Sequence, residues 1–202
     1  MDELVLRGMA KWPNVPAVYG WLRLDRRGNW LIKGEPVSNP TIIAFIGRNY
    51  ASDEHGQWYF QNGPQRVFVA LDYTPFVYRV AGVPDGPIEI EAHNGPVPSM
   101  ISGAWFDEIG APLLLTELGV GVVHDQDLER LIPFFIDANG NAVPEDVFEE
   151  LMGLAEQGRP VPLWLKLRDI SVKLEPIRAA EVPARFGFVP RPTAPAGQDA
   201  ST

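Results

Sequence analysis

Residues 53–80 constrain the fold most, because they read as three short β-strands separated by turns. Aromatic and branched side chains fill three strand-like segments, at residues 58–60, 68–71 and 76–80. The Asn62-Gly63 pair between the first two segments predicts a tight hairpin turn. Thr74-Pro75 predicts a break before the third segment. A chain with this centre is expected to fold around antiparallel strands.

Two helices are predicted between the strands, one in each half of the chain. Asn39 can cap the first helix, and Pro40 suits its first turn, where a missing N–H is harmless. Pro144 opens the second helix, which is expected to run to about Glu156. The predicted fold class is therefore α+β, with mostly antiparallel sheets in two similar halves and one principal helix in each. The expected domains are an N-terminal α+β domain at 1–82, a barrel-like C-terminal α+β domain at 83–190 and a disordered tail at 191–202.

A short internal echo connects the two halves. Asp25-x-x-Gly28-Asn29 is followed by the helix at Pro40, and Asp137-x-x-Gly140-Asn141 is followed by the helix at Pro144. The spacing between the matching positions is not constant. Duplication and chance similarity of turn chemistry both explain the echo, and the residues leave both open.

The acidic residues are concentrated in one block of the chain. The 202 residues carry a net charge of −9, and residues 81–160 hold fifteen acidic and only two basic groups. This block reads either as a solvated surface or as a face that meets a basic protein partner and repels nucleic acid. No Lys/Arg cluster or recognition module is present, so nucleic acid is not an expected partner.

Composition and the N-terminus indicate a cytoplasmic protein. Zero Cys excludes disulfides, thiolate nucleophiles and Cys-ligated zinc. The N-terminus lacks the basic region and apolar run of a secretory signal, and no apolar run approaches the roughly 20 residues that span a bilayer. A membrane partner is therefore not expected.

No motif for catalysis or for a cofactor stands out. The chain has no Gly-x-Ser-x-Gly elbow and no phosphate-binding glycine loop, so we predict no catalytic residue and no cofactor. His124 and Asp127 lie close together in sequence and leave a metal-assisted hydrolase as an alternative. No partner His stands at ligand spacing, so no metal site is predicted.

The remaining candidate is a set of cationic, amide and aromatic side chains around the central strands. Arginine can bind phosphate with two hydrogen bonds, and tryptophan can stack on a base, so the set suits a planar, nucleotide-like anion. The candidate ligand-binding residues are Arg48, Asn49, Trp58, Gln61, Asn62, Gln65, Arg66 and Arg79. The simpler interpretation of the same side chains is structural, with Trp58 packed in the core and the arginines as ordinary surface groups.

Residues 20–80 also resemble an uncharacterised bacterial family of domains of unknown function with a duplicated α+β core. The matching segments are Gly28-Asn29-Trp30, Asn39-Pro40, Asp53–Trp58, Phe60–Val67 and Thr74–Val77. The resemblance implies two domains with internal similarity, a second half like a pleckstrin-homology barrel, and a signalling role with a nucleotide-like ligand between the halves. Gln65 and Arg66 depart from the family, which tends to have a carboxylate and a basic residue there.

These observations favour a non-enzymatic protein of unknown function that binds a small nucleotide-like anion or acts in regulation. The first alternative is a protein-interaction module that uses the acidic second half. The second alternative is the metal-assisted hydrolase at His124 and Asp127.

Overall fold

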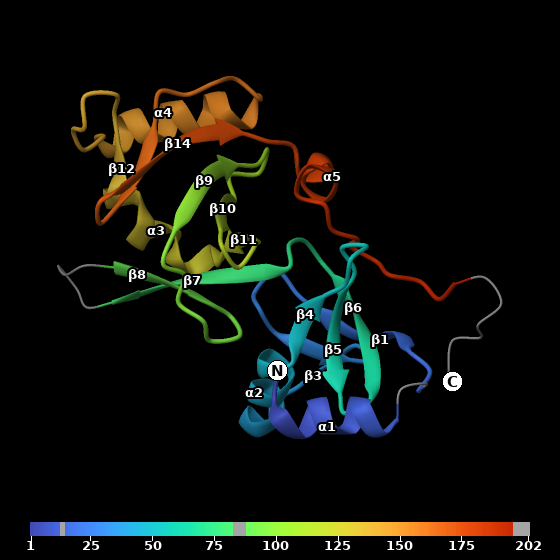
Figure 1. Cartoon of the computed structure of the whole chain (residues 1–202). Coiled ribbons are helices and arrows are strands. Elements are labelled where there is room, and N and C mark those ends of the chain that lie inside the picture. The colour runs from blue at the N-terminus through green and yellow to red at the C-terminus, as the bar shows by residue number, and fades with distance from the viewer. Residues whose placement is uncertain (13–14, 83–87, 196–202) are drawn as a thin grey trace. The chain divides into compact units, whose positions relative to one another are not determined.

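The chain packs into two compact units, which are described here separately from a computed structural model (Figure 1). The structure describes residues 1–12, 15–82 and 88–195. Unit 1 comprises residues 1–75 together with 183–202, and unit 2 comprises residues 76–182. The predicted boundary after residue 82 lies at the end of a strand of unit 2, and residues 196–202 of the predicted tail lie outside the described residues.

Unit 1 is a six-stranded sheet with two helices. Its elements are α1 (Glu3–Lys11), β1 (Val18–Leu24), β2 (Trp30–Ile32), β3 (Glu35–Pro36), α2 (Pro40–Arg48), β4 (Tyr50–Ser52), β5 (Trp58–Asn62) and β6 (Gln65–Leu71). The strand order is β3-β2-β1-β6-β5-β4, and β1 and β6 run parallel at its centre while the other pairs are antiparallel.

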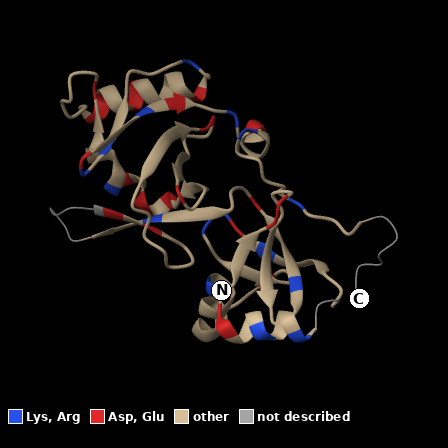
Figure 2. Ribbon diagram, in the orientation of Figure 1, with Lys and Arg blue, Asp and Glu red and all other residues tan. Residues whose placement is uncertain are grey.

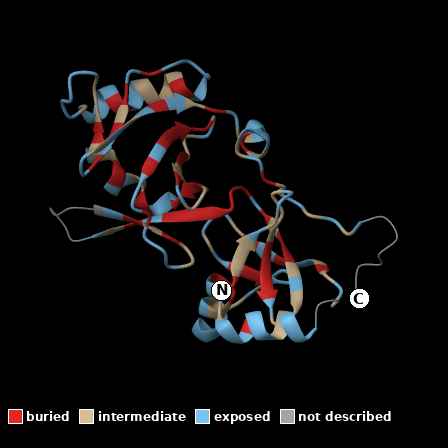
Figure 3. Ribbon diagram, viewed as in Figure 1, coloured by how far each residue is buried: buried red, intermediate tan, exposed pale blue. Residues whose placement is uncertain are grey.

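Unit 2 is an eight-stranded sheet with α-helices and short 3₁₀ turns. Its strands are β7 (Phe76–Gly82), β8 (Ile88–Ala92), β9 (Ile101–Phe106), β10 (Pro112–Thr116), β11 (Val120–Val123), β12 (Phe135–Ile136), β13 (Trp164–Leu167) and β14 (Ile170–Pro176). Its helices are α3 (Leu128–Leu131) and α4 (Glu145–Glu156), with 3₁₀ turns at Asp125–Asp127, Ile132–Phe134 and Ala179–Glu181. Helix α5 (Val182–Phe186) crosses the boundary between the units, because unit 1 resumes at Pro183. β7 is buried for most of its length (Figure 3).

The two sheets share one topology. Six strands of unit 2 lie in the order β11-β10-β9-β14-β13-β12, which matches β3-β2-β1-β6-β5-β4 of unit 1 strand for strand. The central pair is parallel in both, β1 with β6 and β9 with β14. The predicted α+β class with two similar sheet halves is confirmed.

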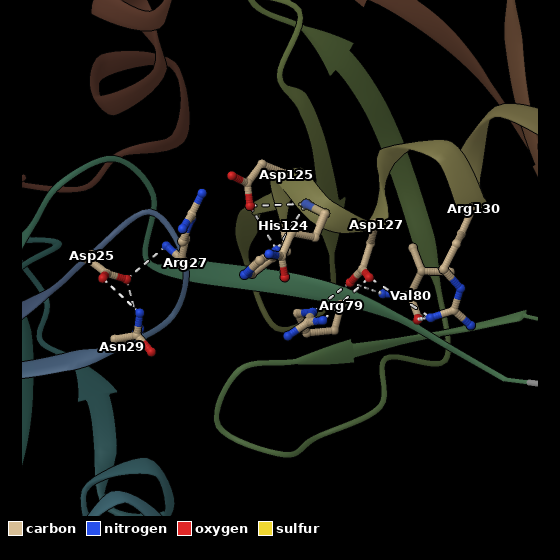
Figure 4. A network of polar contacts seen from close by, with 10 residues as sticks. Asp25, Arg27, Asn29, Arg79, Val80, His124, Asp125, Asp127 and Arg130 are labelled. Atoms are coloured by element: carbon tan, nitrogen blue, oxygen red, sulfur yellow. Dashed lines mark hydrogen bonds and ion pairs between the residues drawn. The ribbon is translucent and has the colours of Figure 1, made fainter. Parts of the chain in front are cut away.

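A single turn type, Asp-x-x-Gly-x, recurs four times in these sheets. In each turn one carboxylate oxygen of the Asp accepts the N–H groups of the second and fourth residues after it, as Figure 4 shows for Asp25. The glycine adopts a left-handed φ between 73° and 84° in all four. The turns begin at Asp25, Asp53, Asp107 and Asp137. Each is therefore fixed by its own side chain, independently of the surrounding core.

The topology pairs these turns differently from the echo in the sequence. Asp25 follows β1 and Asp107 follows the equivalent strand β9, while Asp53 follows β4 and Asp137 follows the equivalent strand β12. The echo therefore joined two turns, at Asp25 and Asp137, that are not equivalent. Helix α4 is an insertion between β12 and β13, where unit 1 has only the Asp53 turn.

The β5–β6 hairpin turns at Gly63-Pro64, so the prediction of a turn centred on Asn62-Gly63 is wrong by one residue. Asn62 pairs directly with Gln65, which leaves Gly63 and Pro64 as the loop. Gly63 has a φ of 56°, and the ring of Pro64 fixes a negative φ at the second position. A glycine at the first of two loop residues is typical of a type II′ turn.

The segment after α5 returns to unit 1 and is hydrogen-bonded there. The N–H of Val189 donates to the carbonyl of Gly56 over 2.9 Å, and the N–H of Leu71 donates to the carbonyl of Pro190 over 2.7 Å. A Cβ added to Gly56 would overlap the Gly187 carbonyl oxygen. The Asp53 turn is thus the place where the end of the described chain packs onto unit 1.

We expect Gly56→Ala to destabilise the protein more than Gly140→Ala. Both glycines hold the same position in the same turn type, with φ of 73° and 84°, so both variants carry the left-handed strain of about 1–2 kcal/mol. Only at Gly56 does the new methyl group also meet the backbone of Gly187, since nothing lies within 4 Å of a Cβ at Gly140. Urea unfolding of the two variants would measure the difference, and equal losses would contradict the contact.

Candidate functional site

Helix α2 covers one face of the unit 1 sheet and borders its main hollow. The side chain of Asn39 caps the helix by accepting the N–H of Thr41 over 2.9 Å, and Pro40 stands at its first turn, as the sequence predicts. The side chains of Ile42, Phe45 and Ile46 recur at helical spacing and line the hollow.

The hollow is an apolar groove of about 540 Å³ between α2 and the sheet, and we call it the α2 groove. Its strand residues come from β1, β2, β5 and β6 and are mainly aliphatic or aromatic: Val18, Trp21, Leu22, Ile32, Phe60 and Val67. The ring of Phe45 on α2 meets that of Phe60 edge-on, with 5.4 Å between centroids. The groove thus has an apolar floor and an apolar helix as its wall.

Large apolar side chains are exposed along the groove. Trp21, Ile32 and Ile42 are 36%, 42% and 44% exposed, and all three line it. Scattered exposed apolar residues need no explanation, but these three border one hollow. These three residues were not among those predicted from the sequence, because exposure cannot be read from residue type.

Two side-chain carboxamides are among the described lining residues. Asn62 and Gln65 face each other as a cross-strand pair of β5 and β6. Gln65 also donates its side-chain amide to the carbonyl of Pro16 over 3.2 Å. Of the eight residues predicted as ligand-binding, the structure brings these two together at the groove.

Arg48 and Asn49 hold the start of α1. The guanidinium of Arg48 pairs with the carboxylate of Asp2, 3.2 Å away, and this hydrogen bond lowers the pKa of Asp2. Asn49 is 1% exposed and accepts the N–H of Asp2 over 2.8 Å. Its amide also donates to the carbonyl of Phe45, so both residues have structural partners.

The strand register places Arg66 and Gln61 on the sheet face opposite to α2. They pair across β5 and β6, next to Phe60, whose side chain faces α2. The guanidinium of Arg66 lies 4.5 Å from the ring centroid of Tyr59. The structure therefore does not bring Arg66 to the α2 groove. Trp58 packs against the ring of Tyr50, with centroids 4.7 Å apart.

In unit 2, Arg79 belongs to an ion-pair network around the buried Asp127 (Figure 4). Its guanidinium donates to Asp127 over 2.6 Å, and the N–H of Val80 donates to the same carboxylate oxygen over 3.0 Å. Arg130 pairs with the other oxygen at 4.0 Å and donates to the carbonyl of Val80. Burial opposes ionisation of Asp127, but the hydrogen bonds from Arg79 and Val80 outweigh it and lower its pKa.

His124 and Asp127, the residues of the predicted metal-assisted hydrolase, already have hydrogen-bond partners. Asp127 is 3% exposed and its carboxylate is bonded as described above, while the Nδ1 atom of His124 accepts the N–H of Gln126 over 3.2 Å. Within residues 1–12, 15–82 and 88–195, no group of three or more His, Asp or Glu side chains is arranged to hold a metal ion. The geometry therefore gives the hydrolase alternative no support.

Figure 2 shows acidic residues along α4 and its neighbouring segments in unit 2. Glu145, Asp146, Glu149 and Glu150 lie on this helix, and its exposed positions include all four. A basic protein partner for this surface stays a prediction.

Comparison with known proteins places the chain in a family. A family model described as "Protein of unknown function (DUF2946)" matches residues 1–193. The chain belongs to this family. The expected membership of an uncharacterised domain-of-unknown-function family is thereby confirmed, while the pleckstrin-homology likeness of the second half stays a prediction.

Two solved structures are similar to the chain. A DUF1285 family protein from Silicibacter pomeroyi DSS-3, solved at 2.50 Å, has a TM-score of 0.52 and 16% identity, over 84% of this chain and 86% of that one. A DUF1285 family protein from Shewanella baltica OS155, solved at 1.40 Å, has a TM-score of 0.42 and 10% identity, over 55% of this chain and 88% of that one. The first likeness shows a shared fold. No curated protein matches the chain.

None of the helices in the part of the chain that the structure describes combines the length and the apolar run that a membrane crossing requires.

We expect Asp127→Ala to lower the free energy of unfolding by about 2–3 kcal/mol, because it leaves the buried Val80 N–H and Arg79 without their acceptor. The folded-state pKa of Asp127 is below its ordinary 3.8, so its contribution is present above pH 3.8 and is lost as pH falls through the folded value. Urea unfolding between pH 2 and 7 would test both effects. Glu129→Ala, at an exposed position of α3, is the control, and an equal loss there would contradict the role of Asp127.

Proposed function

We propose that this protein is a non-enzymatic small-ligand-binding or regulatory protein and that the α2 groove of unit 1 is its binding site. The observation that carries the proposal is a groove of about 540 Å³ with an apolar lining and exposed apolar residues beside it. Sites for small molecules typically enclose about 300–1,000 Å³ and combine apolar walls with a few polar groups. Asn62 and Gln65 supply those polar groups here.

The internal repeat gives this proposal a second support. The turns at Asp25 and Asp107 align Leu22, a groove residue, with Ala104 of unit 2, and align Leu24 with Phe106. In unit 2 the inserted helix α4 packs on this face, where Phe148 lies 6.3 Å from Phe106 between ring centroids. The corresponding segment of unit 1 is the five-residue Asp53 turn, so unit 1 has no counterpart of α4 between β4 and β5.

The lining favours an apolar ligand over the nucleotide-like anion expected from the sequence. The described lining residues carry no charged side chain. Arg48 is paired with Asp2, and Arg66 stacks on Tyr59 across the sheet. An anion at the β5–β6 side of the groove would therefore be desolvated without a counter-charge among the lining residues, which is unfavourable.

The proposal predicts that Ile42→Lys abolishes binding of a small apolar probe and Val147→Lys does not. Both residues are half-exposed helix positions, at 44% and 39%, but only Ile42 lines the groove. Toluene titrated into the methyl-labelled full chain should shift the NMR signals of Ile42, Ile46 and Val67, and the lysine should weaken binding at least tenfold by introducing a charge.

Three results would overturn the proposal. One is the absence of shifts at the groove in the folded wild type, and another is equal binding by the two lysine variants. The third is a concentration-dependent dimer in sedimentation that Ile42→Lys dissociates, because the occupant would then be a second copy of the chain.

A further inference from the structure

We infer that the ligand of the α2 groove is an elongated lipophile with one uncharged hydrogen-bonding end group, the class of a medium-chain alcohol, an inference that rests on the proposed function. Three features of the groove carry it: its dimensions, the position of its polar groups and the charges around it.

The groove extends across the whole width of four strands. Its lining reaches across β2, β1, β6 and β5, and three inter-strand spacings of about 4.8 Å give a length of about 14 Å in that direction. The lining also runs along β1 from Val18 to Leu22. An elongated molecule can therefore lie across the strands with one end at β5 and the other at β2.

The polar groups lie on one side of the groove. The amide pair Asn62 and Gln65 belongs to β5 and β6, whereas the opposite side, on β2 and β1, is formed by Ile32 and Trp21. A ligand lying across the strands therefore meets carboxamides at one end and mainly apolar side chains along the rest. This asymmetry selects a molecule with a single polar end and fixes its direction in the groove.

Two charged side chains lie at the β2 side of the groove, away from the amide pair. The ammonium of Lys33 lies 3.7 Å from the ring centroid of Trp21, at the β2 side. Glu35 is the direct cross-strand partner of Ile32 on that same side. Neither charge is on the strands that carry Asn62 and Gln65, so the polar end of the ligand meets carboxamides, which match a hydroxyl or carbonyl group better than an ion.

The test compares three ligands on the full chain by methyl NMR titration: 1-decanol, decanoate and toluene. We expect 1-decanol to bind more tightly than decanoate. Asn62→Ala should weaken 1-decanol five- to tenfold, because it removes one hydrogen bond to the end group, and should leave toluene unchanged. Asn62→Gln, which keeps a carboxamide, should restore part of the lost affinity. Arg66→Ala, on the opposite face of the sheet, should change none of the three affinities.

The outcomes separate this inference from the proposed function. If toluene and 1-decanol bind in the groove but Asn62→Ala and Gln65→Ala leave the 1-decanol affinity unchanged, the end-group assignment is wrong and the binding site stands. If decanoate binds as tightly as 1-decanol, the ligand is an anion and the inference is overturned. If none of the ligands shifts the groove signals of the folded protein, the inference and the proposed function fail together.

Discussion

The parallel pairing of a unit's first and last core strands determines the rest of its architecture. Parallel neighbours cannot be joined by a tight hairpin, so the chain between β1 and β6 must cross over and return. In unit 1 that crossover contains β2 to β5 and places α2 on one face of the sheet. In unit 2 the same pairing of β9 with β14 accommodates an inserted helix as well. The open groove of unit 1 and the filled face of unit 2 are two results of one connectivity.

Local chemistry made part of the fold predictable from the sequence. Asn39 and Pro40 predict the start of α2, because a capping side chain and a first-turn proline affect only the few residues next to them. The aspartate turns are also determined locally, but all four have the same sequence pattern. Only the strand order shows which turn of unit 1 corresponds to which turn of unit 2. The Gly63-Pro64 loop shows the limit, because Asn62-Gly63 fits a type I′ turn equally well until the register of β5 and β6 is known.

The site was harder to predict than the fold because side-chain chemistry does not reveal which partners a residue already has. Arg48, Asn49 and Arg79 have the functional groups that bind ligands, but the structure gives them Asp2, Phe45 and Asp127 as partners. The groove depends instead on apolar residues that remain exposed, and Ile42 looks in sequence like any core residue of an amphipathic helix. A side chain stays exposed when no other segment packs over it, and those other segments lie far away in the sequence.

The return of the chain to unit 1 has a consequence for how the protein is made. Hydrogen bonds from Val189 to Gly56 and from Leu71 to Pro190 join segments that a ribosome produces far apart in time. Unit 2 is continuous from residue 76 to 182, so all of its strands have been synthesised before the last contacts of unit 1 can form. The unit that begins the chain is thus the last to be completed. During translation its sheet still lacks the contacts of the segment at Val189 and Pro190.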